Sequence, residues 1–215
     1  MLTVSNLHIA FGELDLLSIE NWTLHPRQKI ALVGANGTGK SSLLRVILQE
    51  ELPMNGLVSL RANTQVGYLP QKAVSGSSKT LWEEVKSGMK TILRLEDELE
   101  NIQTRLEQGE QIEEELISKM EEFRLAGGYN QTETIGTTLH GLGFQQDEWQ
   151  RSCTHFSGGW QMRIALAKLL LAEPDLAILD EPTNHLDYQA KEWLANHLSL
   201  VPHDPHHHAW QTSFS

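Results

Sequence analysis

The spacing of apolar residues predicts a chain in which short strands alternate with helices. Alternating or continuous apolar stretches predict extended segments at residues 2–9, 16–25, 30–33, 56–60, 64–69 and 176–179. Apolar residues three and four positions apart predict helices at residues 40–50, 132–143, 157–173 and 188–199. Pro53, Pro70 and Pro174 follow three of these segments and mark turns.

The most regular helical pattern begins at residue 81. Eight apolar residues spaced three or four apart predict one continuous helix of about 26 residues, roughly 40 Å long. They are Leu81, Val85, Met89, Ile92, Leu95, Leu99, Ile102 and Leu106. Thr80 is placed to cap this helix with Glu83 as its partner, whereas Gly88 weakens the helix by about 1 kcal/mol relative to alanine.

A second helix follows the glycine at position 109 and ends at Gly127. Its apolar residues are Ile112, Leu116, Met120 and Phe123. The two helices are expected to fold back on each other as an antiparallel hairpin over about residues 80–126. The alternative is a segment packed into the core, but the acidic outer faces favour a protruding arm.

Composition and charge argue against two classes of protein, one that binds bare nucleic acid generically and one that spans a membrane. The 215 residues include 28 Asp and Glu against 17 Lys and Arg, a net charge of −11, which argues against generic binding to bare nucleic acid. We therefore expect no sequence-specific DNA binding. There is no apolar run of about 18 residues and no signal-peptide pattern, so we expect no membrane span. A single cysteine, Cys153, favours a cytoplasmic protein.

The strongest chemical signal is the stretch GANGTGKSS at residues 34–42, which fits G-x-x-x-x-G-K-[ST]. Its glycines let successive backbone N–H groups point at phosphate oxygens, and the following helix adds its positive end. Lys40 would neutralise the β- and γ-phosphates of a nucleotide, and the Ser41 hydroxyl would ligate Mg²⁺. A plain glycine-rich turn is the alternative, which the predicted flanking strand and helix disfavour.

Two further motifs extend this signal. The apolar run at 176–179 ends in Asp180, placed to hold a Mg²⁺-bound water, and Glu181, placed to polarise an attacking water. FSGGWQMR at residues 156–163 opens a helix with Ser-Gly-Gly, which predicts a second phosphate site at a helix N-terminus.

In this order the motifs resemble the ABC ATPase superfamily. FSGGWQMR followed by DEPTNHLD, residues 180–187, resembles more narrowly its ABC-F subfamily, soluble translation factors associated with the ribosome. The resemblance covers about residues 2–199 and includes LHGLGF at 139–144. It implies an α/β P-loop NTPase fold of the ABC type, with a RecA-like core and a small antiparallel β part. It also implies a helical subdomain over about residues 72–172 that carries the hairpin arm.

The resemblance implies a role for each motif residue. Phe11 would stack on adenine, and Gln71 would be the Q-loop glutamine that touches Mg²⁺ and the water. The phosphates of ATP would be held by Gly34, Ala35, Asn36, Gly37, Thr38, Gly39, Lys40, Ser41 and Ser42. Asp180 would be the Walker B aspartate that joins Ser41 and Gln71 at Mg²⁺, and Glu181 the catalytic base assisted by Lys40 and Gln71.

Other motif residues face a second ATPase domain in the family. Ser157, Gly158 and Gly159 would contact the γ-phosphate of ATP bound to that domain, and Asp187 would be the D-loop aspartate at the interface.

Several of these residues keep a plainer interpretation. Phe11 is equally consistent with a half-buried core aromatic, and Gln71 with a turn residue. Trp160 stands where transporter ATPases commonly carry glutamine and is interpreted as packing the helix start. Arg163 either solvates its helix or acts near the signature loop. His185 and Tyr188 are interpreted as structural.

The C-terminal sequence departs from the family pattern. The family continues with a strand and a Ser-His-Asp switch, whereas His203 comes 16 residues after Asp187 and is flanked by prolines. We expect an ATP-binding domain over residues 1–199 and a disordered His-rich tail over 200–215, apparently truncated after the first ATPase domain. His203, His206, His207 and His208 are interpreted as a mobile tail in preference to a metal site.

The functional expectation is a domain that binds Mg-ATP. Paired with a second such domain, either another copy or a missing C-terminal half, it would hydrolyse ATP to drive switching on the ribosome. One alternative is an ATP-binding module without turnover, which the missing switch histidine favours. Another is the ATPase subunit of a membrane transporter, which the hairpin and FSGGW disfavour.

Overall fold

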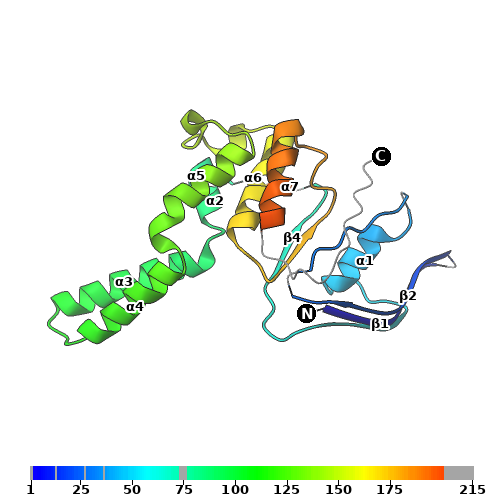
Figure 1. Ribbon diagram of the computed structural model, residues 1–215, viewed down its shortest axis with the longest axis horizontal. Helices are drawn as coiled ribbons and strands as arrows, with labels where there is room; N and C mark the ends of the chain where they lie inside the picture. Colours follow the sequence, from blue (N-terminus) through cyan, green and yellow to red (C-terminus); the bar gives the residue numbers. More distant parts are fainter. Residues whose placement is uncertain (1, 13, 27, 36, 73–76, 201–215) are drawn as a thin grey trace. The chain divides into compact units, whose positions relative to one another are not determined.

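The computed structural model describes residues 2–12, 14–26, 28–35, 37–72 and 77–200. It divides into two compact units, one formed by Met1–Val66 with Ala195–Ser215 and the other by Gly67–Leu194. Figure 1 labels the helices α1 to α7 and the strands β1, β2 and β4. The predicted extents of the ATP-binding domain and of its helical part are not tested by this division and stay predictions.

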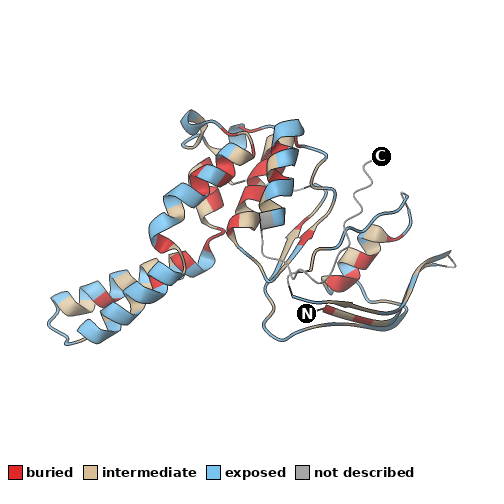
Figure 2. Cartoon of the chain, in the orientation of Figure 1, coloured by how far each residue is buried: buried red, intermediate tan, exposed pale blue. Residues whose placement is uncertain are grey.

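The first unit contains a three-stranded antiparallel sheet in the order β2-β1-β3, together with helix α1. Its elements are β1 (Leu2–Phe11), β2 (Leu14–Leu24), α1 (Lys40–Ile47) and β3 (Asn55–Leu60). The buried apolar residues come from β1 and from one face of α1 (Figure 2). The small antiparallel β part predicted for the N-terminal region is therefore confirmed.

The alternation of buried residues along β1 changes parity at Asn6. Leu2 and Val4 are buried before it, and Leu7 and Ile9 after it. Asn6 takes a left-handed φ of 47°, and the register between β1 and β3 shifts at this point. Gly56 lies opposite, where an added Cβ would stand 2.2 Å from the Asn6 carbonyl oxygen. The bulge at Asn6 therefore requires a glycine across from it.

The strand predicted at residues 30–33 is not formed. Residues 28–35 carry no regular structure, and Ile30, Leu32 and Val33 are exposed. A strand needs a neighbouring backbone to pair with, and both sheets found in the described part of the chain form without this segment. The apolar content of residues 30–33 is therefore not sufficient to predict a strand there.

The second unit combines two short strands with six helices among its described residues. The strands are β4 (Val66–Leu69) and β5 (Leu176–Leu179), which pair with each other. The helices are α2 (Leu81–Lys86), α3 (Lys90–Glu107), α4 (Glu113–Leu125), α5 (Gln131–Gly141), α6 (Gly158–Leu171) and α7 (Tyr188–Leu200), the last of which extends beyond the unit. Short 3₁₀ turns lie at Gly128–Asn130, Gln146–Glu148 and Cys153–His155.

Helix α6 lies at the centre of this unit's core. It contacts α2 and α5, and Ile164, Leu166 and Ala167 on it are buried. Leu81 of α2 and Ile135 of α5 are fully buried as well. The many buried residues of α6 therefore reflect a helix that is covered on several sides.

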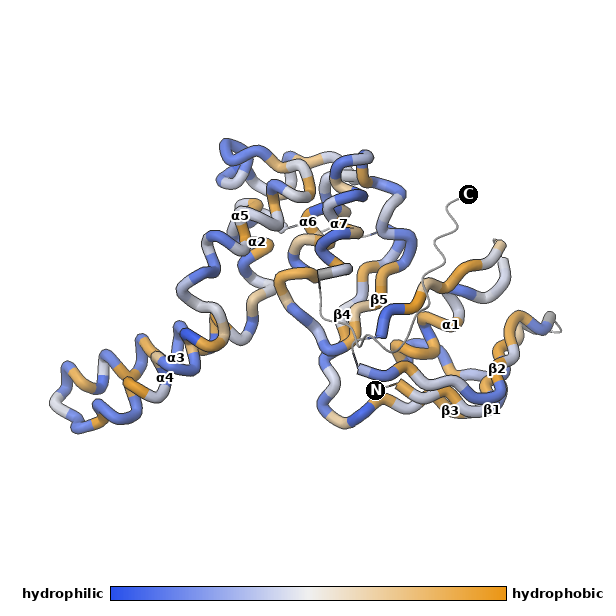
Figure 3. Tube along the Cα trace, in the orientation of Figure 1, coloured by the Kyte–Doolittle hydropathy of each residue, from blue (hydrophilic) through white to orange (hydrophobic). Residues whose placement is uncertain are grey.

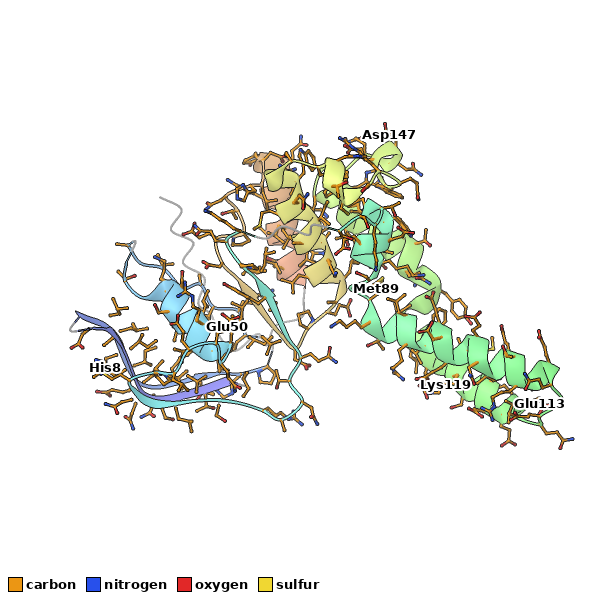
Figure 4. The ribbon with its side chains drawn as sticks, turned by 180° about the vertical axis from the view of Figure 1, so that it is seen from behind. His8, Glu50, Met89, Glu113, Lys119 and Asp147 are labelled. Carbon is orange, nitrogen blue, oxygen red and sulfur yellow. The ribbon has the colours of Figure 1, made fainter. Side chains whose placement is uncertain are left out.

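The predicted helical hairpin is confirmed as α3 and α4. The two helices lie side by side and extend away from the rest of their unit (Figure 1). Figure 3 shows hydrophobic and hydrophilic stretches alternating along both of them. Ile92, Ile102 and Phe123 are buried between or beneath the helices. Lys119, labelled in Figure 4, crosses from α4 to pair with Glu98 of α3 at 2.9 Å.

The prediction of a single long helix from residue 81 is wrong, because the helix is interrupted between α2 and α3. The break lies at residues 87–89, close to Met89 in Figure 4. An added Cβ at Gly88 would stand 2.3 Å from the Lys168 carbonyl oxygen of α6. The chain therefore approaches α6 closely at Gly88, and the absence of a side chain there permits the approach.

Replacing Gly88 with alanine is expected to destabilise the protein by about 1–3 kcal/mol, because a methyl group must displace backbone. Denaturant unfolding measures the effect. Gly158→Ala is the matched control, since nothing lies within 4 Å of an added Cβ there. A Gly88→Ala variant as stable as this control would contradict the close approach.

The predicted cap of α2 is present as a reciprocal pair. The Glu83 backbone N–H donates to Thr80 Oγ1 at 3.2 Å, and the Thr80 N–H donates to Glu83 Oε2 at 2.9 Å. The hydrogen bond from the Thr80 backbone is the main reason why the pKa of Glu83 lies below its ordinary value. The stability from this bond is therefore present above the ordinary pKa of glutamate and is lost as pH falls through the lowered one.

Replacing Thr80 with alanine is expected to cost about 1 kcal/mol of stability, the usual loss for an N-cap side chain. Glu83→Gln should leave a protein whose stability falls less steeply in acid than that of the parent. Urea unfolding near neutral pH and in acid measures both effects. An unchanged acid dependence in Glu83→Gln would exclude this carboxylate as its source.

Candidate functional site

The phosphate loop, defined as residues 34–42, leads directly into α1. Gly37 and Gly39 both have a φ of 85°, and Gly39 is the residue that precedes the helix. An added Cβ at Gly39 would lie 3.2 Å from the Leu16 Cβ of β2. The glycine therefore supplies the left-handed turn and allows the helix to start close to the sheet. Asn36 lies outside the described residues.

The side chain of Lys40 folds back across this loop. Its Nζ donates to the carbonyl oxygens of Gly34 at 2.6 Å and Ala35 at 2.8 Å. The Thr38 hydroxyl also donates to the Ala35 oxygen at 2.9 Å. These carbonyls hold the ammonium over the loop, where an anion bound to the loop's N–H groups would meet it. The first turn of α1, all of it described, carries no acidic residue that would compete.

A second cluster forms where β4 and β5 end. The Asp180 N–H donates to the Leu69 carbonyl at 3.0 Å, which holds the two strand ends together. Two residues beyond Leu69, the Gln71 Nε2 donates to Glu181 Oε2 at 2.8 Å. The structure therefore brings Gln71 together with Glu181 across 110 residues of sequence. Glu181 itself is exposed and has a left-handed φ of 52°, a strained backbone for a glutamate.

Asn184 is a member of this cluster that the sequence did not single out. Its Nδ2 donates to the same Glu181 Oε2 at 2.6 Å, and its N–H bonds the Glu181 carbonyl at 3.3 Å. The turn between the two residues explains the contact. Two amides thus hold one carboxylate oxygen, which leaves the other oxygen for a proton acceptor role.

The signature segment, defined as Ser157–Gly159, starts α6. Ser157 is extended and precedes the first helical turn, and both Ser157 and Gly158 are exposed. Behind them the buried Gln161 donates to the carbonyls of Cys153 at 3.1 Å and Phe156 at 3.3 Å. The exposed helix end is therefore anchored from its buried side. Its N–H groups point outward at the positive end of a 14-residue helix.

Arg163 does not solvate its helix, one of the two roles interpreted from the sequence, because it is buried. Its guanidinium lies 4.4 Å from the centre of the Trp160 ring and forms an ion pair with Asp187 at 2.9 Å. Asp187 Oδ1 also accepts the Ala190 N–H at 2.9 Å. This backbone bond, helped by the hydrogen bond and the charge of Arg163, lowers the pKa of Asp187 below its ordinary value. Trp160 contacts Phe144 as well, with ring centres 4.9 Å apart.

Two sets of predicted residues are outside this description. The side chain of Phe11 is not described, although its backbone ends β1. The histidines at positions 203 and 206–208 lie beyond residue 200. Within the described ranges, no group of three or more His, Cys, Asp or Glu residues is arranged to hold a metal ion. No described helix is long and apolar enough to span a membrane.

Comparisons with known proteins match this arrangement of motifs. The sequence model of the family described as "ABC transporter" matches residues 17–184. The chain is 34% identical to "ABC transporter F family member 5" of Arabidopsis thaliana, covering 94% of this chain and 31% of that protein. It is 33% identical to "Energy-dependent translational throttle protein EttA" of Mycobacterium tuberculosis, covering 93% and 36%. The chain therefore spans about a third of the length of these curated relatives.

The fold is also found among solved structures. An ATP binding subunit of an ABC transporter superposes with a TM-score of 0.63 at 20% identity, covering 92% of this chain and 73% of that one. At this identity the similarity supports the fold, and the motif residues carry the argument about chemistry.

Proposed function

The chain belongs to the ABC transporter family, and from that premise we propose that it binds Mg-ATP as an ABC-F-type nucleotide-binding domain. Paired with a second such domain, it hydrolyses ATP. The observation that best supports hydrolysis is the contact between Gln71 and Glu181, because it joins the two strand-end segments that the reaction needs. The proposed domain covers residues 1–199.

In this proposal the phosphate loop binds the nucleotide. Lys40 exchanges its two carbonyl partners for the β- and γ-phosphate oxygens, and the N–H groups of residues 34–42 bind the remaining ones. Phe11 stacks on the adenine. Ser41, Gln71 and Asp180 would hold Mg²⁺ through a hydroxyl, an amide oxygen and a carboxylate, since oxygen donors of this kind suit the ion.

Glu181 acts as the base in the hydrolytic step. Its carboxylate accepts the proton of a water that attacks the γ-phosphorus in line with the departing β-phosphate oxygen. Gln71 and Asn184 orient the carboxylate by donating to one of its oxygens. Mg²⁺ held by Ser41, Gln71 and Asp180 would supply positive charge to offset the charge that develops on the phosphoryl group.

The exposed signature segment is proposed to contact ATP held by the second domain, with Asp187 at the interface. The second domain is either another copy of this chain or a C-terminal half. One relative is named as a translational throttle protein. We therefore place the proposed open and closed switching on the ribosome, in the cytoplasm.

Three measurements on the purified chain test this proposal. Calorimetry with ATP, with and without Mg²⁺, measures binding, and phosphate release measures turnover. Cosedimentation with ribosomes in the presence of ATP measures the proposed site of action. Binding without phosphate release would identify a non-catalytic ATP-binding module, and absence of binding would exclude the proposal altogether.

A further inference from the structure

The guanidinium of Arg163 contacts two segments that are remote from it in sequence, one at Leu142 and the other at His185–Asp187. Its Nε donates to the His185 carbonyl at 3.0 Å, and its Nη1 donates to the Leu142 carbonyl at 2.9 Å. Nη1 also pairs with Asp187 Oδ2 at 2.9 Å. The Arg163 side chain is only 10% exposed, whereas that of Asp187 is 57% exposed. A buried cation therefore holds an exposed carboxylate in place.

The surroundings of this guanidinium fit arginine in particular. Its Cζ lies over the ring of Trp160, which belongs to the same first turns of α6 as the signature segment. Gly143, with a φ of 92°, leaves the necessary space, because an added Cβ would stand 2.9 Å from Arg163 Nη1. A lysine ammonium is a point charge without the planar fork. It therefore cannot serve these acceptors and stack on the ring in one geometry.

Two contacts hold the side chain of Asp187 in place. Its Oδ1 accepts the Ala190 N–H at the start of α7, and its Oδ2 meets Arg163. Both carboxylate oxygens are thus occupied from inside the chain. The signature segment precedes the same arginine by four to six residues, at the start of α6.

Resting on the proposed function, we propose that Arg163 is a positioning residue that fixes the signature segment relative to Asp187. These are the two segments proposed to face ATP and the second domain. Arg163 itself touches neither the nucleotide nor the reacting atoms. It sets the geometry in which both segments meet the partner domain together.

Amide hydrogen exchange provides a reporter on each side of Arg163. The Gln161 N–H bonds the Ser157 carbonyl at 2.9 Å and reports the signature segment. The Ala190 N–H bonds Asp187 Oδ1 and reports Asp187. In Arg163→Lys both amides should exchange about tenfold faster, as expected for losing a charge-assisted hydrogen bond. The unfolding midpoint should stay close to that of the parent.

Arg151→Lys is the matched control. Arg151 also lies over an aromatic ring, Phe156, at 4.8 Å, and also donates to a carbonyl, that of His155, at 2.7 Å. It is exposed and has no ion pair with Asp187 among its described contacts. Exchange at Gln161 and Ala190 should match the parent in this control. Acceleration at only one reporter in Arg163→Lys, or at neither, would overturn the proposed link.

A second variant guards against a general loss of folding in Arg163→Lys. Asp187→Asn removes the charge from the other end of the link and should accelerate the Gln161 amide as well. In the Arg163→Lys background the same change should add nothing at Gln161, because the link is already broken. Equal effects of Asp187→Asn in both backgrounds would contradict the proposal.

Kinetics separate this inference from the proposed function. Where the parent releases phosphate, Arg163→Lys should lower the rate at saturating ATP about tenfold with KM changed less than about twofold. An unchanged rate would overturn the positioning role. Where the parent releases none, the hydrolytic part of the proposed function fails, and the exchange measurements alone decide on Arg163.

Discussion

Replacing Glu181 with glutamine is expected to reduce phosphate release from Mg-ATP by about 10²–10⁴-fold, the range for loss of a general base. The amide keeps the size of the side chain, and its oxygen can still accept from Gln71 and Asn184. Folding and ATP affinity should therefore be unchanged. Phosphate release and calorimetric ATP binding measure the two effects separately.

Glu173→Gln is the matched control for this prediction. Glu173 is exposed in the same unit, and its φ of 43° is left-handed like that of Glu181. It lies before β5, whereas Glu181 follows that strand. Equal phosphate release in Glu181→Gln and in this control would show that another group takes the proton.

Replacing Lys40 with alanine is expected to weaken Mg-ATP binding by about 100-fold or more. Each charge-assisted hydrogen bond to a phosphate contributes roughly 1.5–3 kcal/mol, and the ammonium is placed to make two. The folded chain should lose little stability, because the carbonyls of Gly34 and Ala35 that Lys40 contacts are exposed to water.

Arg45→Ala tests whether the loss comes from position and not from charge alone. Arg45 lies in the last turn of α1 and pairs with Glu51 at 2.8 Å. The variant removes the same charge from the same helix at its other end. Similar ATP affinities in the Lys40 and Arg45 variants, measured by calorimetry, would exclude a specific phosphate contact by Lys40.

Local patterns predicted the features whose cause is local. The α2 cap depends on Thr80 and Glu83, three residues apart, and the hairpin on an apolar repeat along α3 and α4. The resemblance to ABC ATPases, based on short motifs, was confirmed by the family match over residues 17–184. The assigned roles of the motif residues stay predictions, although Gln71 and Glu181 do meet.

The wrong prediction at Gly88 and the excluded interpretation of Arg163 share a cause, which is a contact with residues far away in the sequence. The helix is interrupted at Gly88, although the apolar repeat continues, because the backbone there packs against Lys168 of α6. Lys168 lies 80 residues later in the chain. Arg163 is buried because carbonyls from residues 142 and 185 converge on it. In both positions the neighbour that decides the outcome is remote in sequence, so periodicity predicts a plausible but different structure.

The interruption at Gly88 also separates the packing of the hairpin from the packing of the core. The break there separates α2, which packs on α6, from α3, which packs on α4. Ile102 and Phe123 are buried, and the Phe123 ring meets that of Tyr129, just after α4, with ring centres 5.1 Å apart. Insertions or deletions of whole helical turns at the tip of the hairpin would change the reach of the arm by about 1.5 Å per residue. Such a change in the length of the arm would lie outside the packing of α2 on α6.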